Sequence, residues 1–205
     1  QVHGLHGQSK PVLRSGAKPG DDIYVTGKIG DGALALLSLG LKSRLDFSLS
    51  KPIDRLSSEA KKYFYEAFYQ PEPRVGLGLA LGNSINSSID ISDGLMGDLG
   101  HILKASNVAA VIESESLPYS DYALDMVSKQ SCLIAALFGG DDYELCFTAS
   151  CGSERKIKTL AKELAVEVTK VGKIVEGSGV SVISGQGQVL DMSNQAYDHF
   201  RETAA

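Results

Sequence analysis

Short β-type segments alternate with longer amphipathic segments along the chain, and this alternation restricts the fold more than any other feature. Segment 22–27, DIYVTG, has the β-branched and aromatic content of a strand that ends at a glycine turn. Segment 53–69 has apolar residues at helical spacing, and prolines follow it. No internal repeat is present, so the chain is predicted to form a mixed sheet covered by helices, in the α/β (α+β) class. Further strands are expected at 87–91, 108–113, 143–148, 166–175, 179–184 and 189–192, and further helices at 30–41, 74–83, 94–106, 120–138 (in two pieces), 154–165 and 194–200.

Composition excludes several classes of protein. The chain has 205 residues, of which 43% are hydrophobic and 22% charged, so it can bury a core and is predicted to fold. A formal net charge of -5 argues against a nucleic-acid-binding face. The longest apolar run, 32–41, is too short to cross a bilayer. The cysteines are Cys132, Cys146 and Cys151, and they lack CxxC spacing. This argues against a disulfide framework or a thiolate zinc site. A reducing, cytoplasmic location is therefore predicted.

Several familiar catalytic signatures are missing from the sequence. There is no GxxxxGK[ST] motif for a P-loop, and GLGLALG at 76–82 does not have the GxGxxG spacing of a dinucleotide site. HExxH and GxSxG are absent as well. The sequence therefore identifies no covalent nucleophile and no catalytic acid or base.

The segment DISDG at 90–94 places oxygen-bearing side chains where a strand gives way to a helix. Side chains alternate along a strand, so Asp90 and Ser92 are expected on one side, and Asp93 follows at the start of the helix. Such oxygen ligands suit a hard cation such as Mg²⁺, which also keeps substrate phosphates in its shell. The alternative is that Asp93 only caps the helix, which would contribute about 1 kcal/mol.

The segment GGDDYELCFT at 139–148 is the second candidate. Its two glycines are expected to allow a tight turn with positive φ. Asp141 and Asp142 then follow a helix C-terminus, where acids are unfavourable for the helix dipole, so another requirement is expected to select them. Tyr143 is expected to begin the following strand. The alternative is a polar turn without a ligand.

The segment RSGAKPGD at 14–21 is the third candidate. Arg14 and Lys18 could contact phosphate oxygens, with the arginine able to do so through two parallel hydrogen bonds. A surface loop with two solvated cations is the alternative.

Five motifs, in this order, resemble the thiamine-monophosphate kinases. They are RSGAKPGDDIYVTGKIGDG, QPEPRVGLGLAL, SIDISDGLMGDLGHILKAS, FGGDDYELCFT and AYDHF, and they extend over essentially the whole chain. The resemblance implies the fold of the superfamily that includes aminoimidazole ribonucleotide synthetase and selenophosphate synthetase. It also implies transfer of the γ-phosphoryl group of ATP to thiamine monophosphate, giving thiamine diphosphate, with several Mg²⁺ ions between the phosphates.

The same resemblance implies a domain organisation. The chain opens QVHGLHG without an initiating Met, so we expect residues 1–19 to be the exit segment and linker from a missing N-terminal domain, and residues 20–205 to be the C-terminal α/β domain. In the family, the N-terminal domain supplies further Mg²⁺ ligands, much of the ATP site and the main dimer interface. We therefore expect a homodimeric full-length protein and an inactive or nearly inactive isolated chain.

The resemblance assigns roles to four of these residues by position. Asp90 and Asp93 match the Mg²⁺ ligands of the family, while Ser92 and Arg14 match nucleotide contacts.

Two further residues match substrate contacts. Tyr197 in AYDHF matches an aromatic residue against the substrate, and Asp141 matches a substrate-contacting acid. The family usually has Glu in GGEDYE, so the shorter Asp141 is a departure that puts direct contact in doubt. Residues 42–54 also form a longer connection than is usual, which we interpret as a surface insertion.

Two other functions remain open at this stage. A sister enzyme of the superfamily, acting on another phosphorylated or ATP-activated substrate, could share the acidic strand end. A non-catalytic binding or scaffolding domain would use the same acids only as caps and solvated turns.

Overall fold

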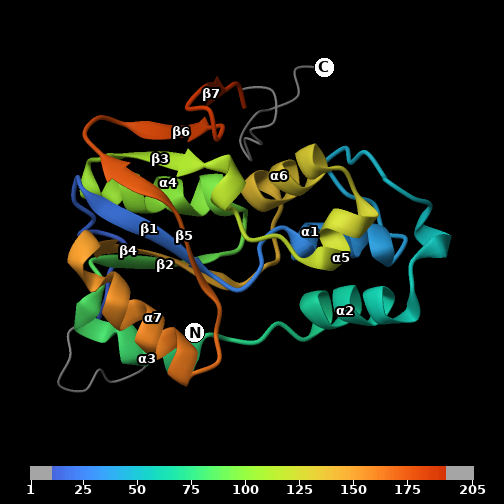
Figure 1. Ribbon diagram of the computed structural model, residues 1–205, viewed down its shortest axis with the longest axis horizontal. Helices are drawn as coiled ribbons and strands as arrows, with labels where there is room; N and C mark the ends of the chain where they lie inside the picture. Colours follow the sequence, from blue (N-terminus) through green and yellow to red (C-terminus); the bar gives the residue numbers. More distant parts are fainter. Residues whose placement is uncertain (1–10, 193–205) are drawn as a thin grey trace, which may run out of the picture.

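One mixed sheet forms the centre of the protein (Figure 1). The computed structural model describes residues 11–192, and within them seven strands pair in the order β2-β4-β1-β5-β3-β6-β7. Every neighbouring pair is antiparallel except β3 and β6, which run parallel. The prediction of a mixed sheet is therefore confirmed. The strands are β1 (Asp21–Thr26), β2 (Ser87–Ile91), β3 (Ala109–Glu113), β4 (Glu144–Ser150), β5 (Val168–Val175), β6 (Gly179–Ile183) and β7 (Val189–Leu190).

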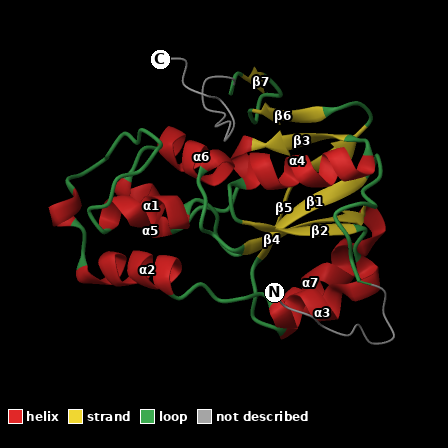
Figure 2. Ribbon diagram, turned by 180° about the vertical axis from the view of Figure 1, so that it is seen from behind, coloured by secondary structure: helices red, strands yellow, loops and turns green. Residues whose placement is uncertain are grey.

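Helices cover both faces of the sheet and extend the molecule at one end (Figures 1 and 2). Helix α4 lies against one face, and α3 and α7 lie against the other. Helices α1, α2 and α5 form a helical extension, and α6 contacts both this extension and α4. No helix within residues 11–192 is long and apolar enough to cross a membrane. The helices are α1 (Asp31–Ser38), α2 (Ser58–Tyr69), α3 (Val75–Leu81), α4 (Leu95–Ser106), α5 (Asp121–Met126), α6 (Lys129–Phe138) and α7 (Glu154–Glu163), with short 3-10 turns at Ile53–Arg55, Gly82–Ser84, Ser114–Ser116 and Cys151–Ser153.

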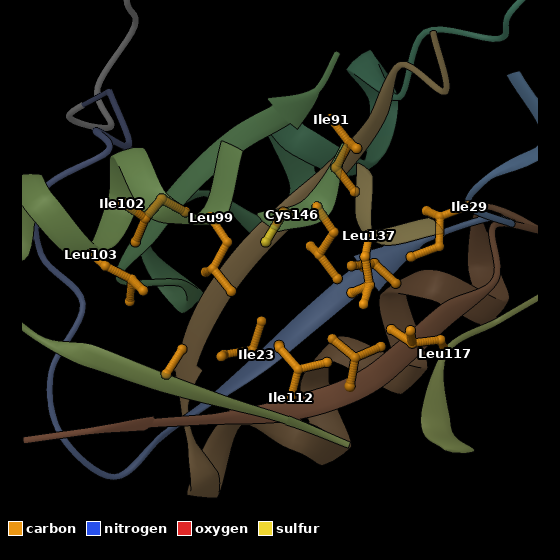
Figure 3. Close-up of a cluster of buried hydrophobic side chains, with 14 of the residues drawn as sticks. Ile23, Ile29, Ile91, Leu99, Ile102, Leu103, Ile112, Leu117, Leu137 and Cys146 are labelled. Atoms are coloured by element: carbon orange, nitrogen blue, oxygen red, sulfur yellow. The ribbon is translucent and has the colours of Figure 1, made fainter. Parts of the chain in front are cut away.

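The largest apolar cluster lies between the sheet, α4 and α6 (Figure 3). Helix α4 has Leu95, Leu99, Ile102 and Leu103 at helical spacing, and all four are buried there. Each such side chain contributes about 1.5–3 kcal/mol when it is fully buried. Packing against this cluster therefore fixes the start of α4 relative to the end of β2.

Two smaller clusters stabilise the opposite face of the sheet and the helical extension. On the opposite face, Tyr24 of β1 and Phe147 of β4 are paired across the strands, and their ring centroids are 5.3 Å apart. These rings pack against α3 and α7. In the extension, Phe64 of α2 is completely buried among residues of α1, α5 and α6. The extension therefore has its own apolar core beside the sheet.

The structure corrects the predicted helix at 53–69. A 3-10 turn spans Ile53–Arg55, the chain is extended at Leu56, and α2 begins at Ser58. The reason is a side-chain cap, because Ser57 Oγ accepts a hydrogen bond from the N–H of Ala60 at 3.1 Å.

The break in the predicted helix at 120–138 is confirmed, but it lies at Val127 and Ser128 instead of around Gln130. Ser128 caps α6 by accepting a hydrogen bond from the N–H of Ser131 at 3.2 Å. The helical turn predicted at 194–200 lies outside the described residues.

Candidate active site

Two of the predicted site residues, Asp90 and Asp93, lie where β2 ends and the chain turns into α4. Strand β2 is at the edge of the sheet, and the Asp90 side chain is exposed. Asp93 is exposed in the turn, and Ser92 between them is half-buried. Neither carboxylate has a hydrogen-bond or ion-pair partner within residues 11–192. Both carboxylates can therefore accept a ligand without breaking a contact in this part of the chain.

A buried carboxylate from α4 holds this turn. Asp98 Oδ2 accepts hydrogen bonds from the N–H groups of Ser92, at 2.8 Å, and Asp93, at 2.9 Å. Burial raises the pKa of Asp98, these two hydrogen bonds oppose the rise, and the charges of Asp93 and Asp90 add to it. Gly94 occupies the N-cap position with a φ of 99° and has no side chain to cap the helix. The alternative in which Asp93 caps α4 is therefore wrong.

The second predicted motif, GGDDYE, lies directly against the first. The N–H of Asp141 donates to the carbonyl oxygen of Ser92 at 3.0 Å, and the N–H of Tyr143 donates to that of Ile91 at 2.8 Å. A Cβ atom on Gly140 would lie 2.5 Å from the Ser92 oxygen, so only glycine allows this approach. The two motifs, far apart in the sequence, form one continuous surface.

The Tyr143 side chain experiences the charges of Asp141, Asp90 and Asp93. The Tyr143 hydroxyl donates to Asp141 Oδ1 at 3.2 Å. The pKa of Tyr143 is raised, first by the charge of Asp141, then by burial and by smaller effects that include the charges of Asp90 and Asp93. Within residues 11–192, no group of three or more Asp, Glu, His or Cys side chains is arranged to hold a metal ion. Asp90 and Asp93 would therefore be a partial ligand set, which suits Mg²⁺ because it binds one or two carboxylates and retains waters or phosphates.

The glycines of the second motif serve close packing, and the prediction that they adopt positive φ is wrong. Gly139 has a φ of -83°, and a Cβ there would lie 2.4 Å from the carbonyl oxygen of Ala135. The positive φ angles belong instead to Asp141, at 69°, and Tyr143, at 53°. Each costs about 1–3 kcal/mol at a residue with a side chain. Because of this conformation Tyr143 precedes β4, which begins at Glu144, and its predicted place in the strand is wrong.

Asp142 explains why acids follow the C-terminus of α6. Its carboxylate accepts hydrogen bonds from the N–H groups of Gly30, at 2.7 Å, and Gly32, at 2.9 Å, and so caps the N-terminus of α1. Burial raises the pKa of Asp142, and these two hydrogen bonds lower it. The sequence analysis missed this role. The available signal was Gly30 itself, because a helix that begins after glycine has no local side chain to cap it.

Arg14 is not part of this surface. The carbonyl oxygen of Arg14 accepts a hydrogen bond from Ser106 Oγ. Ser106 Oγ in turn accepts a hydrogen bond from the N–H of Gly16 at 3.1 Å. Ser106 is the last residue of α4, so the Arg14 backbone lies about 16 Å from the start of α4 along its axis. Tyr197 lies outside the described residues.

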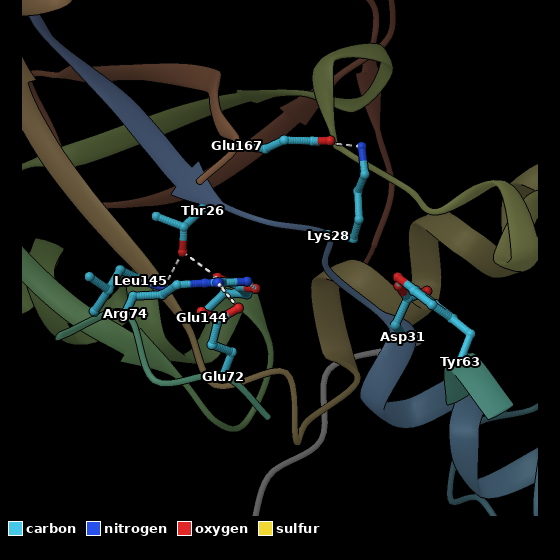
Figure 4. Close-up of polar contacts among 9 residues, drawn as sticks. All are labelled: Thr26, Lys28, Asp31, Tyr63, Glu72, Arg74, Glu144, Leu145 and Glu167. Atoms are coloured by element: carbon cyan, nitrogen blue, oxygen red, sulfur yellow. Dashed lines mark hydrogen bonds and ion pairs between the residues drawn. The ribbon is translucent and has the colours of Figure 1, made fainter. Parts of the chain in front are cut away.

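A cleft of about 470 Å³ lies at the same end of the sheet (Figure 4). Its lining residues come mainly from the β1–α1 turn, from α2 and from the segment that leads to α3. Glu144 is buried beside it, forms two parallel hydrogen bonds with Arg74 at 2.7 and 2.8 Å, and accepts one from Thr26. The cleft is lined by Gly27, Lys28, Asp31, Gly32, Tyr63, Glu66, Ala67, Gln70, Pro71, Glu72, Arg74, Asp142, Glu144 and Glu167.

Asp31 is the other buried acid beside this cleft. It accepts hydrogen bonds from the Tyr63 hydroxyl at 2.6 Å and from Ser120 Oγ at 2.7 Å. Burial raises the pKa of Asp31, and these two hydrogen bonds partly offset the rise. The sequence analysis missed Asp31, Arg74 and Glu144, whose partners come from distant segments.

Comparison with known proteins identifies the family of the chain. Residues 18–185 match the family described as "AIR synthase related protein, C-terminal domain". The chain belongs to this family. Within it, the chain is 38% identical to the thiamine-monophosphate kinase of Escherichia coli K12, over 97% of the chain and 58% of the relative. It is 35% identical to the thiamine-monophosphate kinase of Pyrococcus abyssi, over 92% of the chain and 53% of the relative. The chain thus spans just over half the length of these curated relatives, and the predicted resemblance is confirmed.

Solved structures of this family have the same fold. The crystal structure of thiamine-monophosphate kinase from Stenotrophomonas maltophilia K279a has a TM-score of 0.73 and 36% identity, over 87% of this chain and 54% of that chain. A structure described as "AaThiL complexed with AMPPCP and TMP" has a TM-score of 0.65 and 28% identity, over 88% and 52% of the two chains. The hydrogenase maturation protein HypE of E. coli, at 16% identity and a TM-score of 0.62, shares the fold alone.

Proposed function

We propose that this chain is the C-terminal part of an ATP-dependent kinase that converts thiamine monophosphate to thiamine diphosphate. The observation that carries the proposal is the joining of the DISDG and GGDDYE motifs into one surface with unpartnered carboxylates at a strand end. The thiamine-monophosphate kinases at 34–38% identity, and the neighbour complexed with AMPPCP and TMP, support the choice of substrates.

The proposal includes a second domain. Because the chain spans just over half the length of its relatives, residues 1–19 would link a preceding domain to the α/β domain at 20–205. That other domain would supply further Mg²⁺ ligands, much of the ATP site and the interface of a homodimer. A cytoplasmic location follows from the proposed biosynthetic reaction and from the cysteines without CxxC spacing.

Within this chain, Asp90 and Asp93 would hold Mg²⁺, and their lack of other partners is consistent with this role. When bound, Mg²⁺ would neutralise charge on the phosphate groups. Ser92 would contact the nucleotide, and the start of α4 beside it favours anions through the helix dipole. Arg14 would contact a part of the nucleotide remote from Asp93, since its backbone lies at the other end of α4.

The thiamine monophosphate would lie on the side of Asp141, with Tyr197 against it. Phosphoryl transfer is accelerated largely by positioning and by stabilisation of charge on the phosphate oxygens. The residues of this chain would therefore orient the two phosphate groups and need not form a covalent bond to either. No residue of the chain is assigned as a catalytic base.

The proposal is tested with the longest protein that the reading frame encodes. It is incubated with thiamine monophosphate, ATP and Mg²⁺, and thiamine diphosphate is measured by chromatography, with and without a chelator. We expect chelator-sensitive formation of thiamine diphosphate by the long protein and none by the 205-residue chain. Turnover by the chain alone would overturn its assignment as half of a site. No product from the long protein, or preferred turnover of another phosphorylated compound in competition, would overturn the proposed substrate.

A further inference from the structure

Asp98 is a buried acid that the proposed reaction does not use directly. Its exposed fraction is 3%, and it lies in the first turn of α4. Its backbone N–H donates to the carbonyl oxygen of Gly94 at 3.1 Å, as in any helix, while its side chain reaches back beyond the helix start. There its Oδ2 atom accepts both the Ser92 N–H and the Asp93 N–H. One oxygen atom thus fixes two consecutive peptide groups.

These two peptide groups carry the predicted ligand residues. The peptide plane at Asp93 sets the direction of the Asp93 side chain, and the one at Ser92 sets the exit of β2 after Asp90. In most helices the side chain of the residue at the N-cap satisfies the first free N–H groups. Here Gly94 has no side chain, and Asp98 satisfies the N–H groups of the turn from inside the helix. The Asp93 carboxylate itself has no hydrogen-bond or ion-pair partner within residues 11–192.

The position of Asp98 is unfavourable for stability alone. Its carboxylate is buried close to two other carboxylates of the same charge, and burial of an acid costs free energy that hydrogen bonds only partly return. A serine or asparagine at position 94 could cap the helix start, but Gly94 has a φ of 99° and a Cβ there would lie 2.9 Å from the carbonyl oxygen of Gly139 in the second motif. The contact with the second motif therefore excludes a local side-chain cap, and Asp98 instead bonds the two N–H groups that precede Gly94.

We propose that Asp98 is a positioning residue that holds the backbone of the Ser92–Asp93 turn so that Asp90 and Asp93 present a preformed pair of carboxylates to a divalent cation. The inference rests on the proposed function for the identity of the cation. Residues that orient metal ligands typically change metal affinity or activity about 10–100-fold when they are replaced.

Two substitutions separate the hydrogen bonds of Asp98 from its charge. Asp98→Asn removes the charge but keeps an oxygen that can accept both N–H groups, whereas Asp98→Ala removes both hydrogen bonds. Ser57→Ala is the matched control, because it removes a side-chain acceptor from the first turn of α2, away from this turn, at a cost of about 1 kcal/mol. Asp98→Ser replaces the alanine variant if that variant does not fold, since its side chain is too short to reach both N–H groups.

The experiment measures Mn²⁺ binding by the long protein, using Mn²⁺ as the probe for a Mg²⁺ site and electron paramagnetic resonance of the free ion as the readout. Hydrogen exchange at the Ser92 and Asp93 amides is followed in the same variants. We expect Asp98→Ala to weaken Mn²⁺ binding about 10–100-fold and to abolish protection of both amides. Asp98→Asn should retain amide protection and bind Mn²⁺ within about threefold of the parent, as should Ser57→Ala.

Three outcomes overturn the inference. Unchanged Mn²⁺ affinity in Asp98→Ala would show that the turn does not need the residue. Equal weakening in Asp98→Asn and Asp98→Ala would show that charge, and not the backbone contact, is responsible. Equal weakening in Ser57→Ala would show a general loss of stability. If the long protein forms thiamine diphosphate and any of these three outcomes is seen, the inference about Asp98 is wrong but the proposed function stands. If it neither binds Mn²⁺ nor forms product, the proposed function fails with it.

Discussion

Two sets of acids lie at the same end of the sheet and differ in how their oxygens are used. Asp90 and Asp93 are exposed and have no hydrogen-bond or ion-pair partner within residues 11–192. Asp31, Asp142 and Glu144 line the neighbouring cleft, and each accepts at least two hydrogen bonds from named donors. The exposed pair is therefore free to bind a ligand, whereas the oxygens of the other three acids are used to hold segments of the chain together.

The three acids that line the cleft also differ in the kind of donor that satisfies them. Asp142 is satisfied by backbone N–H groups, Asp31 by two hydroxyl groups, and Glu144 by a guanidinium group and a hydroxyl. Of these three acids, only Glu144 has a cation in contact within residues 11–192. Loss of that cation should have the largest effect on stability, whereas loss of the exposed acids should affect only function.

Replacement of Arg74 is expected to have the largest effect. Arg74→Ala would leave Glu144, of which the side chain is 9% exposed, as a buried charge without its cation, and breaking such a pair costs about 3–5 kcal/mol. The free energy of unfolding in urea measures this loss. The double variant Arg74→Met with Glu144→Gln removes both charges and should lose much less. Equal losses in the single and double variants would contradict this account of the pair.

Replacement of both exposed acids is expected to have the next largest effect, on activity alone. Asp90→Asn combined with Asp93→Asn should reduce kcat/KM of the long protein at least about 10²-fold, because the proposed metal ligands are lost. The free energy of unfolding should change by no more than about 0.5 kcal/mol, since no described contact is broken. Glu163→Gln, an exposed acid on α7, is the control and should change neither. A clear loss of stability in the double variant would show that Asp90 and Asp93 also hold segments of the chain together, as Asp31, Asp142 and Glu144 do.

The smallest effect is expected at Asp31 and depends on pH. Because burial raises the pKa of Asp31 above its usual 3.8, the folded protein holds a proton that the unfolded chain releases. Stability should therefore fall as the pH rises from about 3.8 through the raised pKa, and should not recover above it. Asp31→Asn lacks this dependence, so its stability relative to the parent should increase across that range and then become constant. Urea unfolding from about pH 4 to pH 8 measures the difference. A difference that does not vary with pH would contradict the predicted titration.

Much of the fold could be predicted because its elements carry local signals. The spacing of Leu95, Leu99, Ile102 and Leu103 predicts α4 and its buried side, and these residues are buried as expected. The start of α2 could not be placed, since apolar spacing continues upstream of Ser57 and only the cap decides where the helix begins.

The candidate site could be predicted only in part. The sequence singles out Asp90, Asp93 and Asp141 because each belongs to a compact motif at a turn, and the structure brings these two turns together. Asp98 and the capping role of Asp142 were missed because the partners of both side chains are backbone N–H groups, which no sequence pattern displays. Asp142 also bonds a segment far from it in the sequence. The roles of the glycines were wrong for the same reason, since Gly140 is required by the approach of Ser92 and not by its own φ.

The contact between the two motifs also limits how this surface can change. Gly94 and Gly140 each leave space for a carbonyl group of the other motif, and the Asp141 and Tyr143 amides bond to the strand end opposite them. A change in the backbone of one turn therefore has to be matched in the other. In a chimera with a relative, residues 90–98 and 139–143 would have to be exchanged together, as a single cassette built from two separate stretches of the gene.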